Sequence, residues 1–125
     1  MANNTNPVVW FEIPAKDIMR AKQFYEGAFN FSMTLNEMGS MKMAWFPWID
    51  KAPGTTGSLV ESAGYQPSHA GTTIYFSVSD IDGALLKIEQ NGGKTLNKKT
   101  SIGQYGFIAH FEDTEGNRLA LHAMN

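Results

Sequence analysis

The sequence predicts an α+β fold built from two tandem βαβββ modules. Three observations support this fold class. Short runs of aromatic and β-branched residues are typical of strands, and two segments carry apolar residues at helical spacing. These elements follow the same order twice, one strand, one helix and three strands. We assign module one to residues 8–61, a linker to 62–71 and module two to 72–123, all within a single domain covering residues 1–125.

The first module opens with a strand over residues 8–13, which ends at Pro14. Asp17 is a plausible helix N-cap, and the helix that follows has one apolar face. That face consists of Ile18, Ala21, Tyr25 and Ala28. Three more strands are predicted at residues 31–35, 41–46 and 57–61. A turn at 38–40 and a Pro-Gly loop at 50–56 separate them.

A segment rich in Ser, Gly and Pro links this module to the second. Module two begins with a strand over residues 72–78. Ser79 and Asp82 resemble a capping box, and the helix after them stops at the Asn91-Gly92-Gly93 run. The helical stripe consists of Ile81, Ala84, Leu85 and Ile88. Strands are predicted at 94–98, 105–112 and 118–123, with turns at 101–104 and 113–117.

Identical residues recur at an offset of 63 positions when the two modules are aligned. The matched pairs are Asp17 with Asp80, Ile18 with Ile81, Ala21 with Ala84, and Glu26 with Glu89. The shared offset and the shared order of elements indicate a duplicated unit. Each helix covers one face of its sheet, so we expect the two open faces to bury against each other and leave a cleft between them.

Composition excludes several classes of function. Ten Lys and Arg residues against twelve Asp and Glu give a net charge of −2, without the basic excess of a nucleic-acid binder. The absence of cysteine excludes disulfides, thiolate metal sites and cysteine nucleophiles. No apolar run is long enough for a membrane helix, and the polar N-terminus lacks signal-peptide features. We therefore expect a cytoplasmic protein without nucleic-acid or membrane partners.

Strand alternation gives a set of candidate ligand-binding residues on the open faces of the sheets. The set is Trp10, Glu12, Thr73, Tyr75, Arg118, Ala120 and His122. Four further aromatic residues could complete the sides of a cleft: Trp45 or Phe46, Trp48 and Tyr105. The face of His110 is not fixed by this reasoning. Three methionines, Met38, Met41 and Met43, are interpreted as adaptable core or pocket lining.

Four segments, in this order and spacing, resemble the vicinal oxygen chelate superfamily, which includes glyoxalase I, extradiol dioxygenases and bleomycin-binding proteins. They are Phe11-Glu12-Ile13-Pro14, Arg20-Ala21 with Phe24-Tyr25, Val78-Ser79-Asp80-Ile81-Asp82, and Asp113-Thr114-Glu115-Gly116-Asn117-Arg118. The resemblance covers residues 8–122. It implies an open, cupped mixed sheet with helices on the outside, and a homodimer. Its enzymes hold one divalent metal ion in the cup.

The family's metal-ligand positions fall, by this resemblance, on residues that are poor ligands. They are Trp10, Thr73, Ala120 and either Ser58 or Val60. We therefore predict no metal cofactor. A divalent metal is expected only if the site is rebuilt from other side chains, such as Glu12, His122 and Glu61.

Two functions remain open from the sequence. The first is a metal-free protein that binds a small aromatic or cationic molecule between aromatic side chains. The second is an enzyme of lyase, isomerase or dioxygenase type, with Glu12 as acid/base and His122 as a second catalytic residue, or with a rebuilt metal site. Glu12 also has a structural alternative, an ion pair with Arg118 inside the cup, because burying an unpaired charge is costly.

Overall fold

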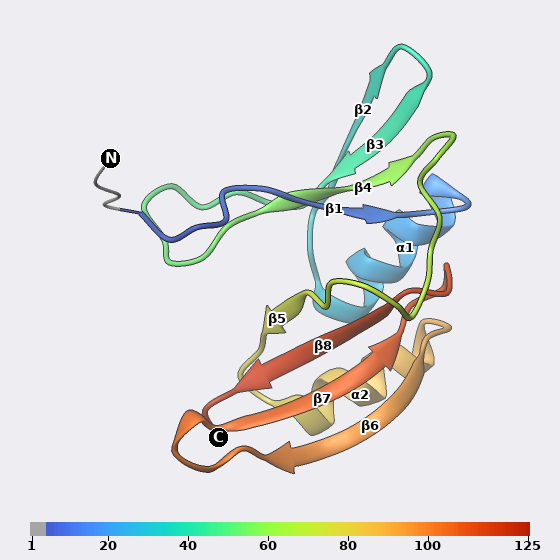
Figure 1. The fold of residues 1–125 in the computed structure, drawn as a ribbon. Helices are drawn as coiled ribbons and strands as arrows, with labels where there is room; N and C mark the ends of the chain where they lie inside the picture. The colour runs from blue at the N-terminus through green and yellow to red at the C-terminus, as the bar shows by residue number, and fades with distance from the viewer. Residues whose placement is uncertain (1–4) are drawn as a thin grey trace.

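The structure is a computed structural model that describes residues 5–125, and it contains the βαβββ order twice (Figure 1). Module one consists of β1 (Phe11–Pro14), α1 (Ile18–Phe29), β2 (Thr34–Met38), β3 (Met41–Trp45) and β4 (Gly57–Glu61). Module two consists of β5 (Tyr75–Ser77), α2 (Ile81–Gln90), β6 (Lys94–Ser101), a 3-10 turn (Gly103–Tyr105), β7 (Phe107–Glu112) and β8 (Arg118–Ala123). The predicted fold class is confirmed.

Each module forms its own four-stranded mixed sheet. Sheet 1 has the order β1-β4-β3-β2 and sheet 2 the order β5-β8-β7-β6. In each sheet the first strand runs parallel to the last strand of its module, and the other pairings are antiparallel. The two sheets lie one after the other in Figure 1, with β1 and β5 at the adjoining edges. The architecture is therefore open, not a closed barrel.

Both helices begin at the aspartates that the 63-residue offset pairs. The Asp17 carboxylate accepts from the backbone N–H groups of Met19 and Arg20, each at 3.1 Å. Asp80 accepts from the N–H of Gly83 at 3.2 Å. The predicted capping box at Ser79 is therefore wrong by one residue: Asp80 has the extended backbone and the acceptor position of an N-cap.

Strand limits differ from the predictions where other groups satisfy the backbone. Residues 31–33 connect α1 to β2, because the N–H of Met33 donates to the Glu26 carboxylate and Phe31 stacks on Phe29. Residues 8–10 lie outside β1. Together with residues 47–56 they form an extended segment, here called the arm, which projects from the body of the molecule (Figure 1).

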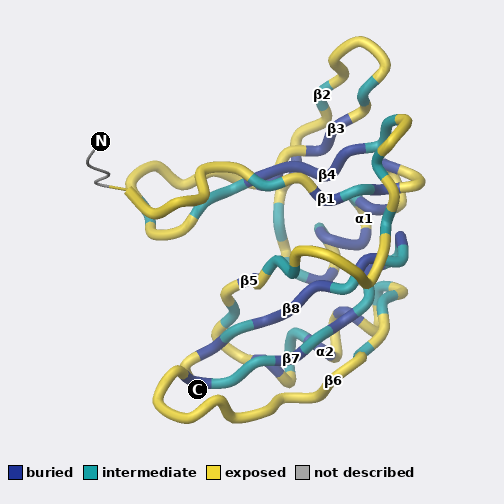
Figure 2. Tube along the Cα trace, in the orientation of Figure 1, coloured by how far each residue is buried: buried dark blue, intermediate teal, exposed yellow. Residues whose placement is uncertain are grey.

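One apolar core joins the two modules on the helix-covered side of both sheets (Figure 2). The α1 side chains Phe24 and Tyr25 are buried, and the Phe24 ring lies 6.3 Å from the Phe111 ring of module two. The expectation that the open faces bury against each other is wrong. Trp10 remains 39% exposed and Tyr75 49% exposed, because the modules pack through the helix-covered side instead.

The turn at residues 113–117 holds the modules together with buried polar groups. Glu115, 2% exposed, accepts from the N–H groups of Lys16 and Asp17, and from the guanidinium of Arg20 at 2.8 and 3.0 Å. Burial by itself raises the pKa of Glu115. The bonds from Arg20, Asp17 and Thr114 outweigh it, so the pKa lies below its ordinary value.

Asp113 and Asn117 extend this network into the core. Tyr25 donates to Asp113 at 2.8 Å, and the Asn117 amide donates to Asp113 and to the carbonyl of Pro14 at the end of β1. Burial raises the pKa of Asp113, and burial beside Asp113 raises that of Tyr25 well above its usual value. The end of β1 and the start of α1 are therefore fixed to module two through one turn.

Replacing Glu115 by Gln is expected to lower the free energy of unfolding at pH 7 by about 1–3 kcal/mol, because charged hydrogen bonds are lost in a buried site. The folded pKa of Glu115 lies below its ordinary value of 4.5. The stabilisation that the ionised Glu115 gives to the folded state is therefore complete above pH 4.5, and it is lost as the pH falls through the folded pKa. Urea denaturation of wild type and Glu115→Gln at pH 7 and pH 3.5 measures both effects.

The difference in the free energy of unfolding between wild type and Glu115→Gln should shrink at the lower pH. Titration of Asp113 does not affect this difference, because both proteins contain Asp113. Glu37→Gln, at an exposed position of β2, serves as the control and should change stability by no more than about 0.5 kcal/mol. Equal stability of wild type and Glu115→Gln at pH 7 would contradict the assignment.

Candidate functional site

Residues that share the helix-free face of sheet 2 follow the predicted alternation. Tyr75 pairs with Ala120 and Ser77 with His122, while Phe76 and Leu121 pair on the helix-covered face. His110 lies opposite Ala120 and therefore belongs to the open face as well. Its ring is 6.2 Å from the Tyr75 ring. The alternation of His110 with buried Ala109 and Phe111 would have assigned its face from the sequence.

The open face of sheet 1 carries an aromatic pair beside a carboxylate. Trp10 and Trp45 meet edge to face, with ring centroids 5.8 Å apart. Glu12 lies two residues after Trp10 and pairs with Ser58, which pairs in turn with Trp45. Indole rings and a carboxylate on one surface suit a planar or positively charged molecule.

A hollow of about 450 Å³ lies between the two modules, beside β1. It brings together three of the seven candidate residues, Trp10, Glu12 and Arg118. The remaining lining residues come from the arm (Val8), from β1 (Phe11, Ile13, Pro14), from the linker (Gln66, Ser68, Ala70), from the segment before β5 (Thr72, Ile74), and from the 113–117 turn and β8 (Asn117, Leu119). The linker contribution is a part of the site that the sequence reasoning missed.

Glu12 and Arg118 do not form the ion pair considered from the sequence. Glu12 accepts instead from the hydroxyl of Tyr65, a linker residue, at 2.8 Å. This hydrogen bond to Glu12 raises the pKa of Tyr65. Arg118 donates through Nη2 to the Thr73 hydroxyl at 3.0 Å, and its buried Nε has no hydrogen-bond partner. The hollow therefore presents the Glu12 carboxylate together with the Arg118 guanidinium, whose Nε lies buried.

The other four candidate residues lie outside this hollow. Thr73 and Tyr75 line a second hollow of about 570 Å³, together with Phe11, Phe46 and residues of the arm. Ala120 and His122 line neither hollow. His122 lies near the end of β8, where its Nε2 is 2.6 Å from the carbonyl oxygen of Tyr105.

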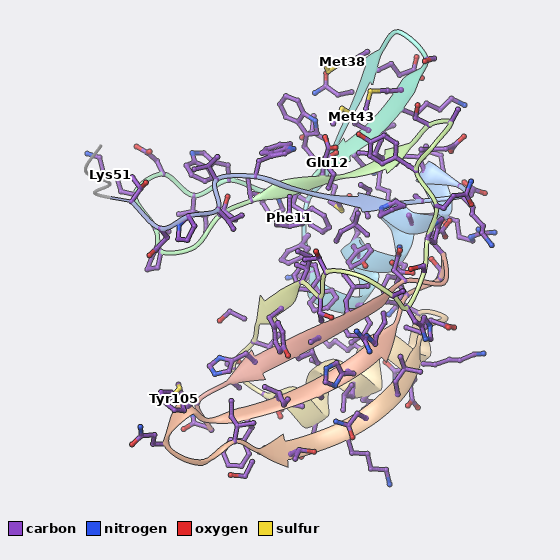
Figure 3. All side chains as sticks on the ribbon, viewed as in Figure 1. Phe11, Glu12, Met38, Met43, Lys51 and Tyr105 are labelled. Carbon is purple, nitrogen blue, oxygen red and sulfur yellow. The ribbon has the colours of Figure 1, made fainter. Side chains whose placement is uncertain are left out.

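The four additional aromatic candidates also separate. Phe46 is a core residue that reaches the second hollow, and Trp45 contacts Trp10. Trp48 lies in the arm, 61% exposed. Tyr105 lies near the far end of sheet 2, 66% exposed (Figure 3). Only Trp45 therefore lies beside the Trp10–Glu12 surface.

The family's ligand positions do not fit a divalent metal ion. Trp10 and Ala120 have no metal-binding oxygen or imidazole, and the Thr73 hydroxyl accepts from Arg118. Ser58 and Val60 both face the open side, paired with Glu12 and Pro14. The buried Ser58 hydroxyl donates to the carbonyl of Leu59 at 2.7 Å.

A rebuilt metal site finds no support either. Glu61 accepts from the N–H of Ile18 at the start of α1, whereas Glu12 and His122 have the partners given above. Within residues 5–125, no three His, Asp or Glu side chains are placed where they could hold a metal ion together. We derive no metal-dependent step from this site.

Two βαβββ units with a ligand-sized hollow between them define a class of duplicated α+β proteins. Residues 8–121 match the Glyoxalase/Bleomycin resistance protein/Dioxygenase superfamily, and the chain belongs to this superfamily. A glyoxylase-like domain-containing protein from Didymella fabae is 32% identical over 116 residues, which cover 88% of each chain.

Solved structures share the fold at lower identity. TnmS3, an antibiotic binding protein from Streptomyces sp. CB03234, has a TM-score of 0.71 at 19% identity, covering 98% of both chains. The V278E mutant of glyoxalase I from Zea mays has a TM-score of 0.72 at 18% identity. The match covers 94% of this chain and 46% of the maize chain, so this protein corresponds to about half of that enzyme. Within the described residues, no helix has the length and apolar character to span a membrane.

Proposed function

We propose that this protein binds a small planar aromatic or cationic molecule in the hollow beside β1, without the divalent metal of its superfamily. The observation that carries the proposal is the composition of that hollow, in which Trp10, Glu12 and Arg118 meet at the boundary of the two modules. Its volume of about 450 Å³ lies within the range of small-molecule sites.

Each of these three groups supplies a different interaction. Trp10, held edge-on by Trp45, offers an indole face for stacking or for a cation. Glu12 offers a carboxylate for a cationic or hydrogen-bond-donating group. The Arg118 guanidinium, which lines the same hollow, offers a donor group to an acceptor atom of the ligand. TnmS3, the antibiotic binding protein of similar fold, supports a binding role over the whole length of such a chain.

An enzymatic role is the second candidate, and the Glu12–Tyr65 hydrogen bond favours it. A tyrosine hydroxyl 2.8 Å from a carboxylate in a ligand-sized hollow is a pair through which a proton can move. The reaction would be of lyase or isomerase type with Glu12 as acid/base. In that case Glu12→Gln would abolish turnover, and activity retained in this variant would remove Glu12 as the base.

Trp10→Ala is expected to weaken binding of a planar cation about fivefold, since a stacked aromatic pair contributes roughly 1 kcal/mol. Proflavine, a planar aromatic cation, is a suitable probe, and its fluorescence anisotropy reports the affinity. Glu12→Gln should weaken proflavine binding but leave the uncharged analogue acridine at pH 8 unaffected, because only the cation gains from the carboxylate.

Tyr105→Ala and Glu37→Gln provide controls at exposed positions outside the hollow and outside the arm. Both should bind proflavine like the wild type. Unchanged affinity in Trp10→Ala would exclude Trp10 from the site. An equal loss for both probes in Glu12→Gln would exclude the charge interaction.

We also propose that the protein is a homodimer, with the arm in the interface. Four apolar side chains of the arm are strongly exposed: Val9 at 75%, Ile49 at 71%, Trp48 at 61% and Val8 at 58%. A cluster of this kind on a projecting segment is typical of a surface that another chain covers. Val8 and Trp10 of the arm also line the hollow beside β1, so the partner would lie beside the ligand site.

Sedimentation velocity at micromolar concentration is expected to show twice the chain mass of 13.8 kDa. The double variant Trp48→Ser/Ile49→Ser should shift the protein to the monomer, because it removes two of the strongly exposed apolar side chains of the arm. Leu86→Ser, which changes an exposed leucine on α2, is the control and should remain dimeric. A wild-type monomer would refute the proposal.

A further inference from the structure

The hairpin of β2 and β3 carries a group of three methionines that do not line the proposed ligand site, and only Met43 among them is buried. Three of the seven methionines of the chain fall within six residues, Met38, Met41 and Met43. Met38 and Met41 are direct cross-strand partners on either side of the Gly39-Ser40 turn. Gly39 has φ 63°, the left-handed conformation that a tight hairpin turn requires.

Strand geometry places all three thioethers on one face of the hairpin. Cross-strand partners have Cβ atoms about 5 Å apart, and residues two apart on one strand lie about 7 Å apart on the same face. Met43 follows Met41 by two residues and pairs with Asn36 and Val60. A methionine side chain has three rotatable bonds, so three sulfur atoms at these positions can converge on one point.

The same face is free of charged cross-strand neighbours at this end of the hairpin. Glu37 and Lys42 pair with each other on the opposite face. The direct cross-strand partners on the methionine face carry no charge, since Met38 pairs with Met41, and Met43 pairs with Asn36 and Val60.

The three methionines become more exposed from the base of the hairpin to its free end, and packing against the core does not explain why methionine occupies the outer positions. Met43 is 5% exposed at the base, Met41 is half-buried, and Met38 is 59% exposed toward the free end (Figure 3). Within the described chain, β2 packs substantially only on β3, and the hairpin stands away from the body (Figure 1). Met38 therefore adds little to the core, while the gradient gives a cation an open route to a partly desolvated position.

We propose that Met38, Met41 and Met43 form a binding site for Cu(I), with three thioether ligands. Soft, polarisable thioethers select Cu(I) over the divalent ions that carboxylates and imidazoles prefer. The chain contains no cysteine that could compete for the ion. Thioethers do not titrate, so binding should persist in mildly acidic solution. The site lies on a different part of sheet 1 from the hollow and does not depend on the proposed function.

Titration with Ag(I), a redox-inert ion of the same charge and softness, tests the geometry directly. In protein labelled with ¹³C at the methionine methyl groups, one equivalent of Ag(I) should shift the resonances of Met38, Met41 and Met43. The resonances of Met19, Met33 and Met124 should stay in place. Equal shifts at the exposed Met19 and Met124 would show unspecific binding to thioethers and would overturn the proposal.

Competition for Cu(I) with bicinchoninate, under nitrogen with ascorbate, measures the affinity and separates Cu(I) from Ag(I). Met38→Leu should lower Cu(I) affinity at least about tenfold, because one of three ligands is lost. Leucine is close to methionine in volume, and Met38 is exposed, so this variant keeps the fold.

The triple variant Met38→Leu/Met41→Leu/Met43→Leu should lose binding altogether, whereas Met19→Leu and Met124→Leu should match the wild type. Two results contradict a Cu(I) site here. One is a wild-type protein that removes no Cu(I) from bicinchoninate, and the other is a triple variant that still competes. Binding of Ag(I) without Cu(I) would also reject the assignment of the ion.

Discussion

The buried carboxylates of the 113–117 turn are the constraint on which the rest of the structure depends. Glu115 binds the backbone between β1 and α1 as well as Arg20, and Asp113 binds Tyr25 within the core. The Asn117 side-chain amide donates a hydrogen bond to the carbonyl of Pro14 at the end of β1. The two sheets share no hydrogen-bonded strand pair among the described residues, so these polar contacts and the apolar core set their relative position.

This constraint also creates the candidate site. Glu12 belongs to β1 and Trp10 immediately precedes it, while Arg118 follows directly after the turn that holds the end of β1. The turn therefore fixes both sides of the hollow. A buried carboxylate with several donors is costly to leave unpaired, so loss of any one contact should loosen the boundary where the ligand would bind.

Much of this arrangement could be predicted from the sequence, because it depends on local periodicity. Strand alternation predicted Trp10, Glu12 and Arg118 for the open faces, and the N-cap at Asp17 was predicted directly, whereas the second N-cap is Asp80 and not Ser79. The contacts that cross between modules could not be predicted in this way. Tyr65 comes from a linker without periodicity, and it takes the place beside Glu12 that the ion pair with Arg118 would have occupied.

The proposed function has one central feature: the chain keeps the superfamily fold, whereas the positions that the resemblance assigns to metal ligands hold Trp10, Thr73 and Ala120. Elemental mass spectrometry tests it most directly, on tag-free protein purified without chelator and then offered Ni, Co, Mn, Fe and Zn. We predict no stoichiometric divalent ion, because the donor atoms at these positions are absent or already bonded. One equivalent of any of these ions per chain would contradict the account and favour an enzyme with a rebuilt site.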